Sequence, residues 1–252
     1  RCADSEGFVK QELVDYHAAR SHEGKGPGLV IAQQTFAWPA VKLAQGLALW
    51  DDKYIEKLAA LASAIKKGGS RAVLQLGGSG SRLAGIEMAP SPVIGSWNMK
   101  RPREISREEM MHYLRCYAEA GRRLYEAGFE GFSLHGRAGK YIAQFLSPWS
   151  NRRTDEFGGS PENRVRYPLM IVDAIRERTR SDFPVIMGTF SREGIEGGLS
   201  LEEGIEQISI MAERGVDAFL LASGGQESLY LECPPYPLPD IPGLDDITAV
   251  KR

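Results

Sequence analysis

Residues 135–164 read HGRAGKYIAQFLSPWSNRRTDEFGGSPENR and connect the end of an apolar run to the start of a helix. The run 131–135 (GFSLH) is continuous enough to predict a buried strand. Ser160-Pro161 places a capping hydroxyl before a proline, which is typical of a helix N-terminus. Residues 151–155 and 157–159 are interpreted as structural, with Arg–Asp pairing and a glycine turn of positive φ. The stretch therefore predicts a strand, a long loop and a helix.

The same alternation continues on both sides of this stretch. Strands are predicted at 28–32, 71–76, 131–135, 183–189 and 217–223. Helices are predicted at 11–20, 51–67, 106–127 and 161–180, from 200 onward, and as a short segment from 244. A Pro- and Gly-marked loop is expected at 77–105. Continuous apolar strands separated by helices indicate an α/β fold with a parallel sheet covered on both faces.

Two parallel architectures are compatible with this pattern. Five β/α units with loops of variable length are typical of a (β/α)8 TIM barrel. A doubly wound open sheet is the alternative, but no G-x-G-x-x-G follows any predicted strand. The barrel is therefore the favoured prediction.

Composition narrows the class of protein. The chain has 252 residues, 42% of them hydrophobic, and a net charge of -2, so no global basic field indicates nucleic acid or an acidic membrane surface. Cys2, Cys116 and Cys233 show no metal or disulfide spacing. We expect a cytoplasmic protein without a metal site, because no signal peptide or membrane-length apolar run is evident.

The predicted strand ends carry a polar set. In a parallel barrel these ends face the active site, and here they read Gln33-Gln34, Gln75, His135, Gly188-Thr189 and Ser223-Gly-Gly225. The set contains no carboxylate pair, and no nucleophile lies beside a base. Its chemistry must therefore come from hydrogen bonding and from histidine.

Each candidate residue has a functional and a structural interpretation. Gln75 could bind a heterocycle edge through its amide, or satisfy loop backbone. His135 could donate a hydrogen bond or carry a proton, or connect the strand to its loop. Lys140 and Tyr141 could supply a proton to a bound substrate, or lie on the surface as an ordinary loop pair. These alternatives stay open on the residues alone.

A longer segment, QFLSPWSNRRTDEFGGSPENRVRY at 144–167, resembles the signature of the old yellow enzyme family, the NADH:flavin oxidoreductases. Shorter matches at 4–8, 28–31, 126–129 and 215–217 extend the resemblance over essentially the whole chain. It implies an FMN-binding (β/α)8 barrel that passes hydride from NADH or NADPH to an activated alkene or similar acceptor. Residues 1–252 would form a single partial domain covering about strands 2–6.

The resemblance also implies roles for the candidate residues. Gln75 falls on the glutamine that contacts the flavin pyrimidine ring. His135 falls on the first residue of a His-x-x-His/Asn pair that binds the substrate's electron-withdrawing oxygen. Gln34 stands where a small residue lets the flavin approach, and would project toward it.

Besides Gln34, three positions depart from the family pattern. Ala138 replaces the second member of the pair. Lys140 replaces the usual proton-donating tyrosine, with Tyr141 displaced by one. Gly188 replaces the arginine expected on the flavin N1 side, where a lost charge-assisted hydrogen bond costs roughly 1.5–3 kcal/mol.

These observations leave three hypotheses. The first is a flavin-dependent oxidoreductase with a small-molecule substrate, in which His135 polarises the acceptor and Lys140 or Tyr141 supplies the proton. The second is a flavin-free family member acting as a structural or regulatory subunit of a homo- or hetero-oligomer. The third uses His135 and Lys140 as acid and base in redox-neutral chemistry.

Overall fold

The computed structural model describes residues 3–21, 25–39, 46–78, 88–95, 100–232 and 243–251. It divides into two compact units. Unit 1 comprises Arg1–Gly78, Met111–Leu134 and Ile171–Val185. Unit 2 comprises Ser79–Met110, His135–Met170 and Ile186–Arg252.

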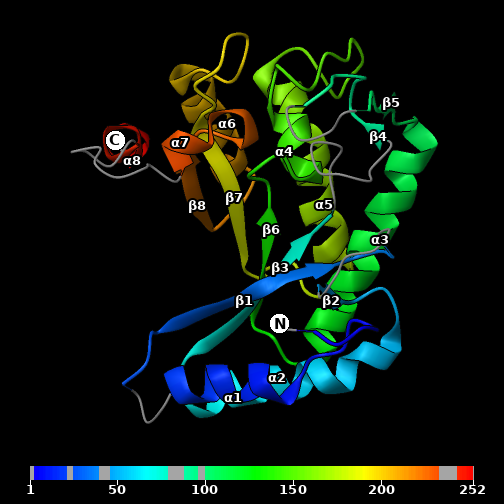
Figure 1. Cartoon of the computed structure of the whole chain (residues 1–252), viewed down its shortest axis with the longest axis vertical. Coiled ribbons are helices and arrows are strands. Elements are labelled where there is room, and N and C mark those ends of the chain that lie inside the picture. Colours follow the sequence, from blue (N-terminus) through cyan, green and yellow to red (C-terminus); the bar gives the residue numbers. More distant parts are fainter. Residues whose placement is uncertain are drawn as a thin grey trace. The chain divides into compact units, whose positions relative to one another are not determined.

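All five predicted strands are present in one parallel sheet (Figure 1). They are β1 (Leu29–Phe36), β3 (Arg71–Gly77), β6 (Gly131–His135), β7 (Val185–Arg192) and β8 (Ala218–Ser223). A two-residue strand that was not predicted, β2 (Leu47–Ala48), pairs with β1. The order is β2-β1-β3-β6-β7-β8, so the five long strands follow each other in sequence order. A doubly wound sheet reverses its order at a switch point, and these strands do not.

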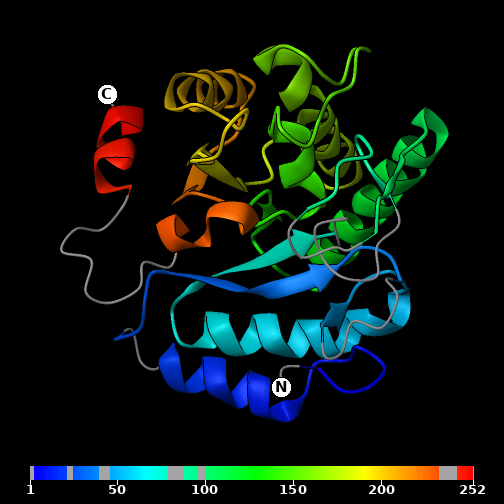
Figure 2. The ribbon, with the colours of Figure 1, turned by 45° about the horizontal axis from the view of Figure 1, so that its top comes forward.

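Unit 1 is covered by helices whose apolar spacing follows the helical repeat. In α2 (Ile55–Lys67), the buried side chains are Leu58, Leu61, Ala62 and Ile65. The helix ends just before Gly69, which adopts a φ of +92°. Figure 2 shows α2 along the strands, with α1 (Gln11–Arg20) beside it. The long helix α3 (Arg107–Glu126) begins at Ser106, whose hydroxyl accepts a hydrogen bond from the Glu109 N–H at 3.2 Å.

Two further helices begin in unit 2 at serine N-caps. Helix α5 (Pro161–Arg178) starts at Ser160, and α6 (Leu201–Glu213) starts at Ser200 with a complete capping box involving Glu203. The sequence did not predict α4 (Tyr141–Leu146), α7 (Leu229–Glu232), the 3₁₀ turn η3 (Gln226–Ser228), or the two-residue strands β4 (Met88–Ala89) and β5 (Arg103–Glu104). Residues 79–87 and 96–99 of the predicted loop lie outside the described residues.

The loop between α4 and α5 confirms its structural interpretation. The buried Asn151 amide donates to the carbonyl oxygens of Phe145 at 2.8 Å and Phe157 at 2.7 Å. Arg153 pairs with Asp155 at 2.5 Å, and Gly159 has the expected positive φ of +84°. The loop therefore holds α4 and the start of α5 in a fixed arrangement.

Helix α8 (Leu244–Lys251) is the short helix predicted from 244. Its buried Asp246 carboxylate accepts hydrogen bonds from Ser223 at 2.6 Å and from Ser191 at 3.1 Å. These serines lie at the C-terminal ends of β8 and β7. One carboxylate therefore connects α8 to both strands.

Candidate functional site

In unit 1, a β-bulge shapes the C-terminal part of β1. The register pairs Ala32 with Leu74 and Thr35 with Leu76, so Gln33 and Gln34 together oppose Gln75. Bulges of this kind redirect a side chain and often lie beside active sites. Gln34 is packed so closely over Gly77 that a Cβ at that position would collide with its amide. Its Nε2 is buried, and it has no hydrogen-bond partner among the described residues.

Gln75 extends this polar row onto the neighbouring strands of unit 1. It is half-buried on β3, and its Cα is in register with that of Ser133 on β6. The Ser133 hydroxyl is fully buried, and the described part of the chain provides no partner for it. The two glutamines and Ser133 therefore form a row of hydrogen-bonding groups across β1, β3 and β6.

In unit 2, His135 follows at the end of β6. Burial and the charges of Lys140 and Arg137 lower the pKa of its imidazole from 6.5 to about 3. The imidazole is therefore neutral at physiological pH, with one nitrogen as donor and the other as acceptor. The buried Nδ1 has no hydrogen-bond partner within the described ranges. A neutral imidazole can polarise a carbonyl-type oxygen by donating one hydrogen bond.

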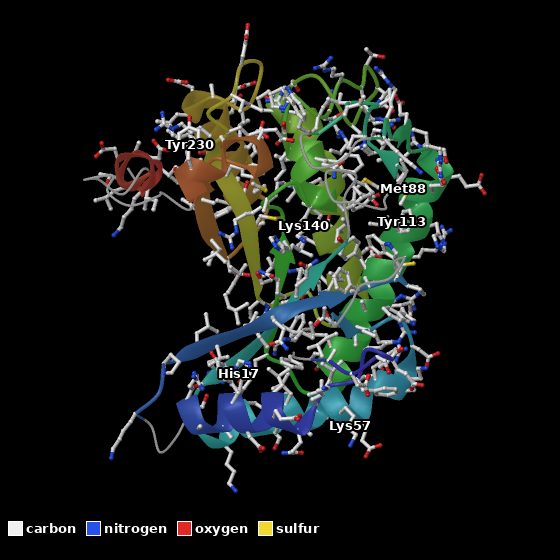
Figure 3. All side chains as sticks on the ribbon, in the orientation of Figure 1. His17, Lys57, Met88, Tyr113, Lys140 and Tyr230 are labelled. Carbon is white, nitrogen blue, oxygen red and sulfur yellow. The ribbon has the colours of Figure 1, made fainter. Side chains whose placement is uncertain are left out.

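Lys140 lies just before α4, at the C-terminal end of β6 (Figure 3). The side chain is half-buried, and burial lowers the pKa of its ammonium group. No carboxylate of the described residues forms an ion pair with Lys140. A lysine whose pKa is lowered toward the working pH is suited to donating a proton.

Tyr141 lies in the aromatic core of unit 2. The side chain is 1% exposed and packs edge-on against Phe145 and Tyr167. Its hydroxyl donates to the Tyr167 hydroxyl at 3.1 Å, and Tyr167 donates to the Met110 carbonyl at 2.8 Å. In this arrangement the Tyr141 hydroxyl belongs to a buried hydrogen-bond chain.

The positions that depart from the family pattern also have distinct environments. Gly188 is buried on β7, and a Cβ on Gly136 would collide with its carbonyl oxygen, so the two backbones are in close contact. Ala138 has a φ of +48°, a left-handed conformation that is unusual for alanine. Beside Gly188, the buried Thr189 hydroxyl has no partner among the described residues.

In unit 2, the segment that follows β6 thus carries hydrogen-bond donors and two cations, and the described residues provide no acidic partner of Lys140. The described residues contain no group of three His, Cys, Asp or Glu side chains able to hold a metal, and Cys2 and Cys233 lie outside them. Within the same residues, no helix is long and apolar enough to cross a membrane.

Sequence reasoning did not identify Ser133 and Arg137. Ser133 is a polar residue inside the apolar run 131–135, and alternation places it on the same face of β6 as His135. The two-residue spacing between Ser133 and His135 could therefore have identified Ser133 as a candidate site residue. Arg137 could have been noticed as a second cation between His135 and Lys140, and its effect on the His135 pKa shows that its charge reaches the ring.

Known proteins match this chain over most of its length. The model of the NADH:flavin oxidoreductase / NADH oxidase family matches residues 1–225. An NADH oxidase from Thermoanaerobacter brockii is 35% identical over 234 residues, which are 90% of this chain and 36% of that protein. An NADPH dehydrogenase from Geobacillus sp. (strain WCH70) is 34% identical over 78% of this chain and 58% of its own length. The chain therefore spans between about a third and three fifths of these relatives.

Solved structures agree with the predicted architecture. Histamine dehydrogenase from Rhizobium sp. 4-9 superposes with a TM-score of 0.78 at 28% identity, covering 89% of this chain and 34% of that protein. An old yellow enzyme homologue from Zymomonas mobilis superposes with a TM-score of 0.74 at 22% identity, over 89% of this chain and 67% of its own, which supports the fold alone. The predicted α/β fold, an incomplete barrel of the TIM type, is confirmed. With a family model matched over residues 1–225, the chain belongs to the NADH:flavin oxidoreductase / NADH oxidase family.

Proposed function

We propose that this chain acts as an NAD(P)H:flavin oxidoreductase that reduces a polarised double bond. The observation that carries the proposal is that strand-end polar groups in each unit have no hydrogen-bond partner among the described residues. Gln34 Nε2 and the Ser133 hydroxyl belong to unit 1, and His135 Nδ1 and the Thr189 hydroxyl belong to unit 2. A buried polar atom without a partner costs about 1–3 kcal/mol, so the atoms of each unit favour a polar ligand bound to that unit.

The residues present fit a flat heterocycle with donors and acceptors on its edge. Gln75 and Gln34 would hold the pyrimidine side of FMN through their amides, since each amide both donates and accepts. When bound, FMN would supply hydride transfer from NADH or NADPH to the acceptor. The fit is weakest at Gly188, which offers no side chain.

The roles of the remaining residues follow from their protonation states. Neutral His135 donates a hydrogen bond to the electron-withdrawing oxygen of the acceptor and orients it. Lys140 delivers the proton to the carbon that does not receive hydride, aided by its lowered pKa. Tyr141 was an alternative proton donor, but its hydroxyl already donates to Tyr167, so we assign the proton to Lys140.

A titration of the purified full chain with FMN tests this proposal. We expect protein-bound flavin absorption bands, and FMN affinity reduced about tenfold in Gln75→Ala, the loss of about one hydrogen bond to a bound ligand. Gln11→Ala is the matched control, because Gln11 is an exposed glutamine on α1. Equal FMN affinities of Gln75→Ala and the wild type would contradict the assignment of Gln75.

The flavin-free alternative is favoured by Gly188, which leaves no cation at the position where the family resemblance expects one. The variant Gly188→Arg separates the two functions. If the wild type fails to bind FMN and Gly188→Arg binds it, the chain is a family member that has lost its flavin. If neither binds FMN at high concentration, the oxidoreductase proposal is rejected.

A further inference from the structure

The bulge of β1 decides on which face of the sheet the Gln34 side chain lies. Side chains alternate along a strand, so in a regular strand Gln34 would lie on the same face as Ala32. Ala32 is in register with Leu74, on the face of β3 opposite to that of Gln75. Gln34 instead packs over Gly77, which shares its face of β3 with Gln75. The additional residue in β1 therefore directs the Gln34 amide to the Gln75 face.

Gln33 is the other residue of the bulge, and two side chains of unit 1 hold it in place. The hydroxyl of the fully buried Thr35 donates to the Gln33 carbonyl oxygen at 3.3 Å. The side chain of Gln33 forms a hydrogen bond with the imidazole of His17, a buried residue carried by α1 (Figure 3). These residues all belong to unit 1. The bulge is therefore fixed both through the backbone of Gln33 and through its side chain.

The direction of the hydrogen bond between His17 and Gln33 follows from its effect on the ring. Burial lowers the pKa of the His17 imidazole, whereas the bond to Gln33 raises it and the charge of Arg20 lowers it. A bond that raises the pKa of a histidine is one in which the ring N–H donates. The acceptor is then the amide oxygen of Gln33, in agreement with its buried Nε2, which has no partner among the described residues. The neutral ring provides this one N–H at physiological pH.

Loss of the imidazole N–H would leave the half-buried Gln33 amide without this partner for its oxygen as well. A buried polar atom without a partner costs about 1–3 kcal/mol. The strand β1 could relieve this cost by turning Gln33 toward solvent or by losing its bulge. Either movement would withdraw Gln34 from Gly77, because the bulge is what places Gln34 on that face.

We propose that His17 is a positioning residue, whose N–H, donated to Gln33, fixes the bulge of β1 and so holds the Gln34 amide over Gly77. The inference deepens the proposed function and rests on it for the ligand, because Gln34 is one of the two glutamines assigned to the pyrimidine side of FMN. His17 acts through Gln33 and not on the ligand itself. It favours binding because the Gln34 amide is already oriented before the ligand arrives.

The orientation of Gln34 is measured by nuclear magnetic resonance on the full chain without ligand. In the wild type, we expect a nuclear Overhauser effect between the side-chain amide protons of Gln34 and the α-protons of Gly77. His17→Phe keeps a flat ring but removes the donor, so it should weaken this effect severalfold. His17→Gln restores an N–H and should recover the effect. His112→Phe is the matched control and should leave it unchanged, because His112 is exposed on α3.

The variant Gln33→Met removes the acceptor of the same hydrogen bond and tests the inference even if His17→Phe does not fold. It should weaken the Overhauser effect as His17→Phe does. The double variant should be no worse than either single variant, since both substitutions act on one bond. An Overhauser effect that is absent in the wild type, unchanged in either single variant, or reduced additively in the double variant would overturn the inference.

A titration of the same variants with FMN connects the orientation of Gln34 to binding. FMN affinity should fall about threefold in His17→Phe, which is part of the contribution of one hydrogen bond, and should recover in His17→Gln. If the wild type and His17→Phe bind FMN equally, the orientation of Gln34 has no effect on the ligand and the inference is rejected. If the wild type binds no FMN but the Overhauser effects change as expected, the proposed function fails and the positioning role of His17 stands.

Discussion

Two neighbouring stretches of unit 2 differ in whether their buried polar side chains find hydrogen-bond partners within the protein. From 144 to 167, each of the buried side chains Asn151, Arg153 and Arg164 makes hydrogen bonds to backbone or to an opposite charge, although Arg164 Nε has no partner among the described residues. From 135 to 141, His135 Nδ1 has no partner among the described residues and Ala138 adopts a left-handed conformation. The first stretch is built for stability. The second keeps hydrogen-bonding capacity and backbone strain that a scaffold would not retain.

This difference teaches where to look for function in a chain of this kind. The segment that identifies the family is held by hydrogen bonds of its own, such as those of Asn151, so it would persist even in a member without activity. The segment whose polar groups lack hydrogen-bond partners is the one to which a ligand can supply those partners. Mutations should therefore act on stability in the first stretch and on ionisation and local strain in the second.

The largest expected effect is in the scaffold stretch, at Arg164. The residue is 2% exposed, and its guanidinium pairs with Glu203 at 2.6 Å and donates to the Gly159 carbonyl. Arg164→Met should lower the free energy of unfolding by about 2–4 kcal/mol, because it leaves these acceptors without their donor. Urea unfolding followed by circular dichroism measures the change.

Arg166→Met provides the matched control for Arg164. Arg166 is an exposed arginine two residues along α5, and it donates to the Glu156 carbonyl and to Asn163. Its replacement should cost about 0.5 kcal/mol or less. Similar losses in the two variants would mean that burial does not distinguish the scaffold arginine from a surface one.

A smaller effect is expected from His135 as the pH falls. The folded-state pKa is lowered to about 3 from 6.5, so between these values the unfolded chain takes up a proton that the folded chain does not. The contribution of His135 to stability is therefore complete above pH 6.5 and is lost as the pH falls toward 3. From about pH 7 to about pH 5, the wild type should lose roughly 2 kcal/mol more stability than His135→Gln.

Parallel unfolding free energies of the wild type and His135→Gln over this pH range would contradict the burial of a neutral imidazole. His112→Gln is the control, since His112 is exposed on α3. Calorimetric or urea unfolding at several pH values, in one buffer of constant ionic strength, gives the comparison.

The smallest effect is expected at Ala138, where the backbone conformation favours a different residue. Asparagine tolerates a φ of +48° better than alanine does, so Ala138→Asn should raise the free energy of unfolding by about 0.5 kcal/mol. Ala138→Val should lower it by about 1–2 kcal/mol, because a β-branched side chain is strained there. The two thermal midpoints should move in opposite directions, and a shared direction would show that this conformation is not maintained in solution.

The sequence predicted the elements of the fold well because their signals are local. The strand at 131–135 was predicted with its correct bounds, and the caps at Ser160 and Ser200 mark real helix starts. Each signal depends on apolar spacing or on a side chain within four residues. Short elements such as α4 were missed because six residues are too few to establish a helical period.

The candidate site could be predicted only in part, because its geometry depends on pairing between distant strands. The bulge at Gln33–Gln34 arises from the register of β1 against β3, about forty residues away, and has no local signature. The inward orientation of the Tyr141 hydroxyl depends on Tyr167, twenty-six residues along the chain. His135 could be predicted as a site residue because its position after an apolar run places it at a strand end.

The Asp246 carboxylate has a consequence for how this part of the chain opens. It accepts hydrogen bonds from a buried serine at the end of β7 and from another at the end of β8, and all three residues are buried. If α8 detached, two hydroxyls and a carboxylate would have to be hydrated together, so partial release is unfavourable. Helix α8 and the ends of the two strands should therefore form one cooperative opening unit, whose amide protons exchange with solvent in the same event.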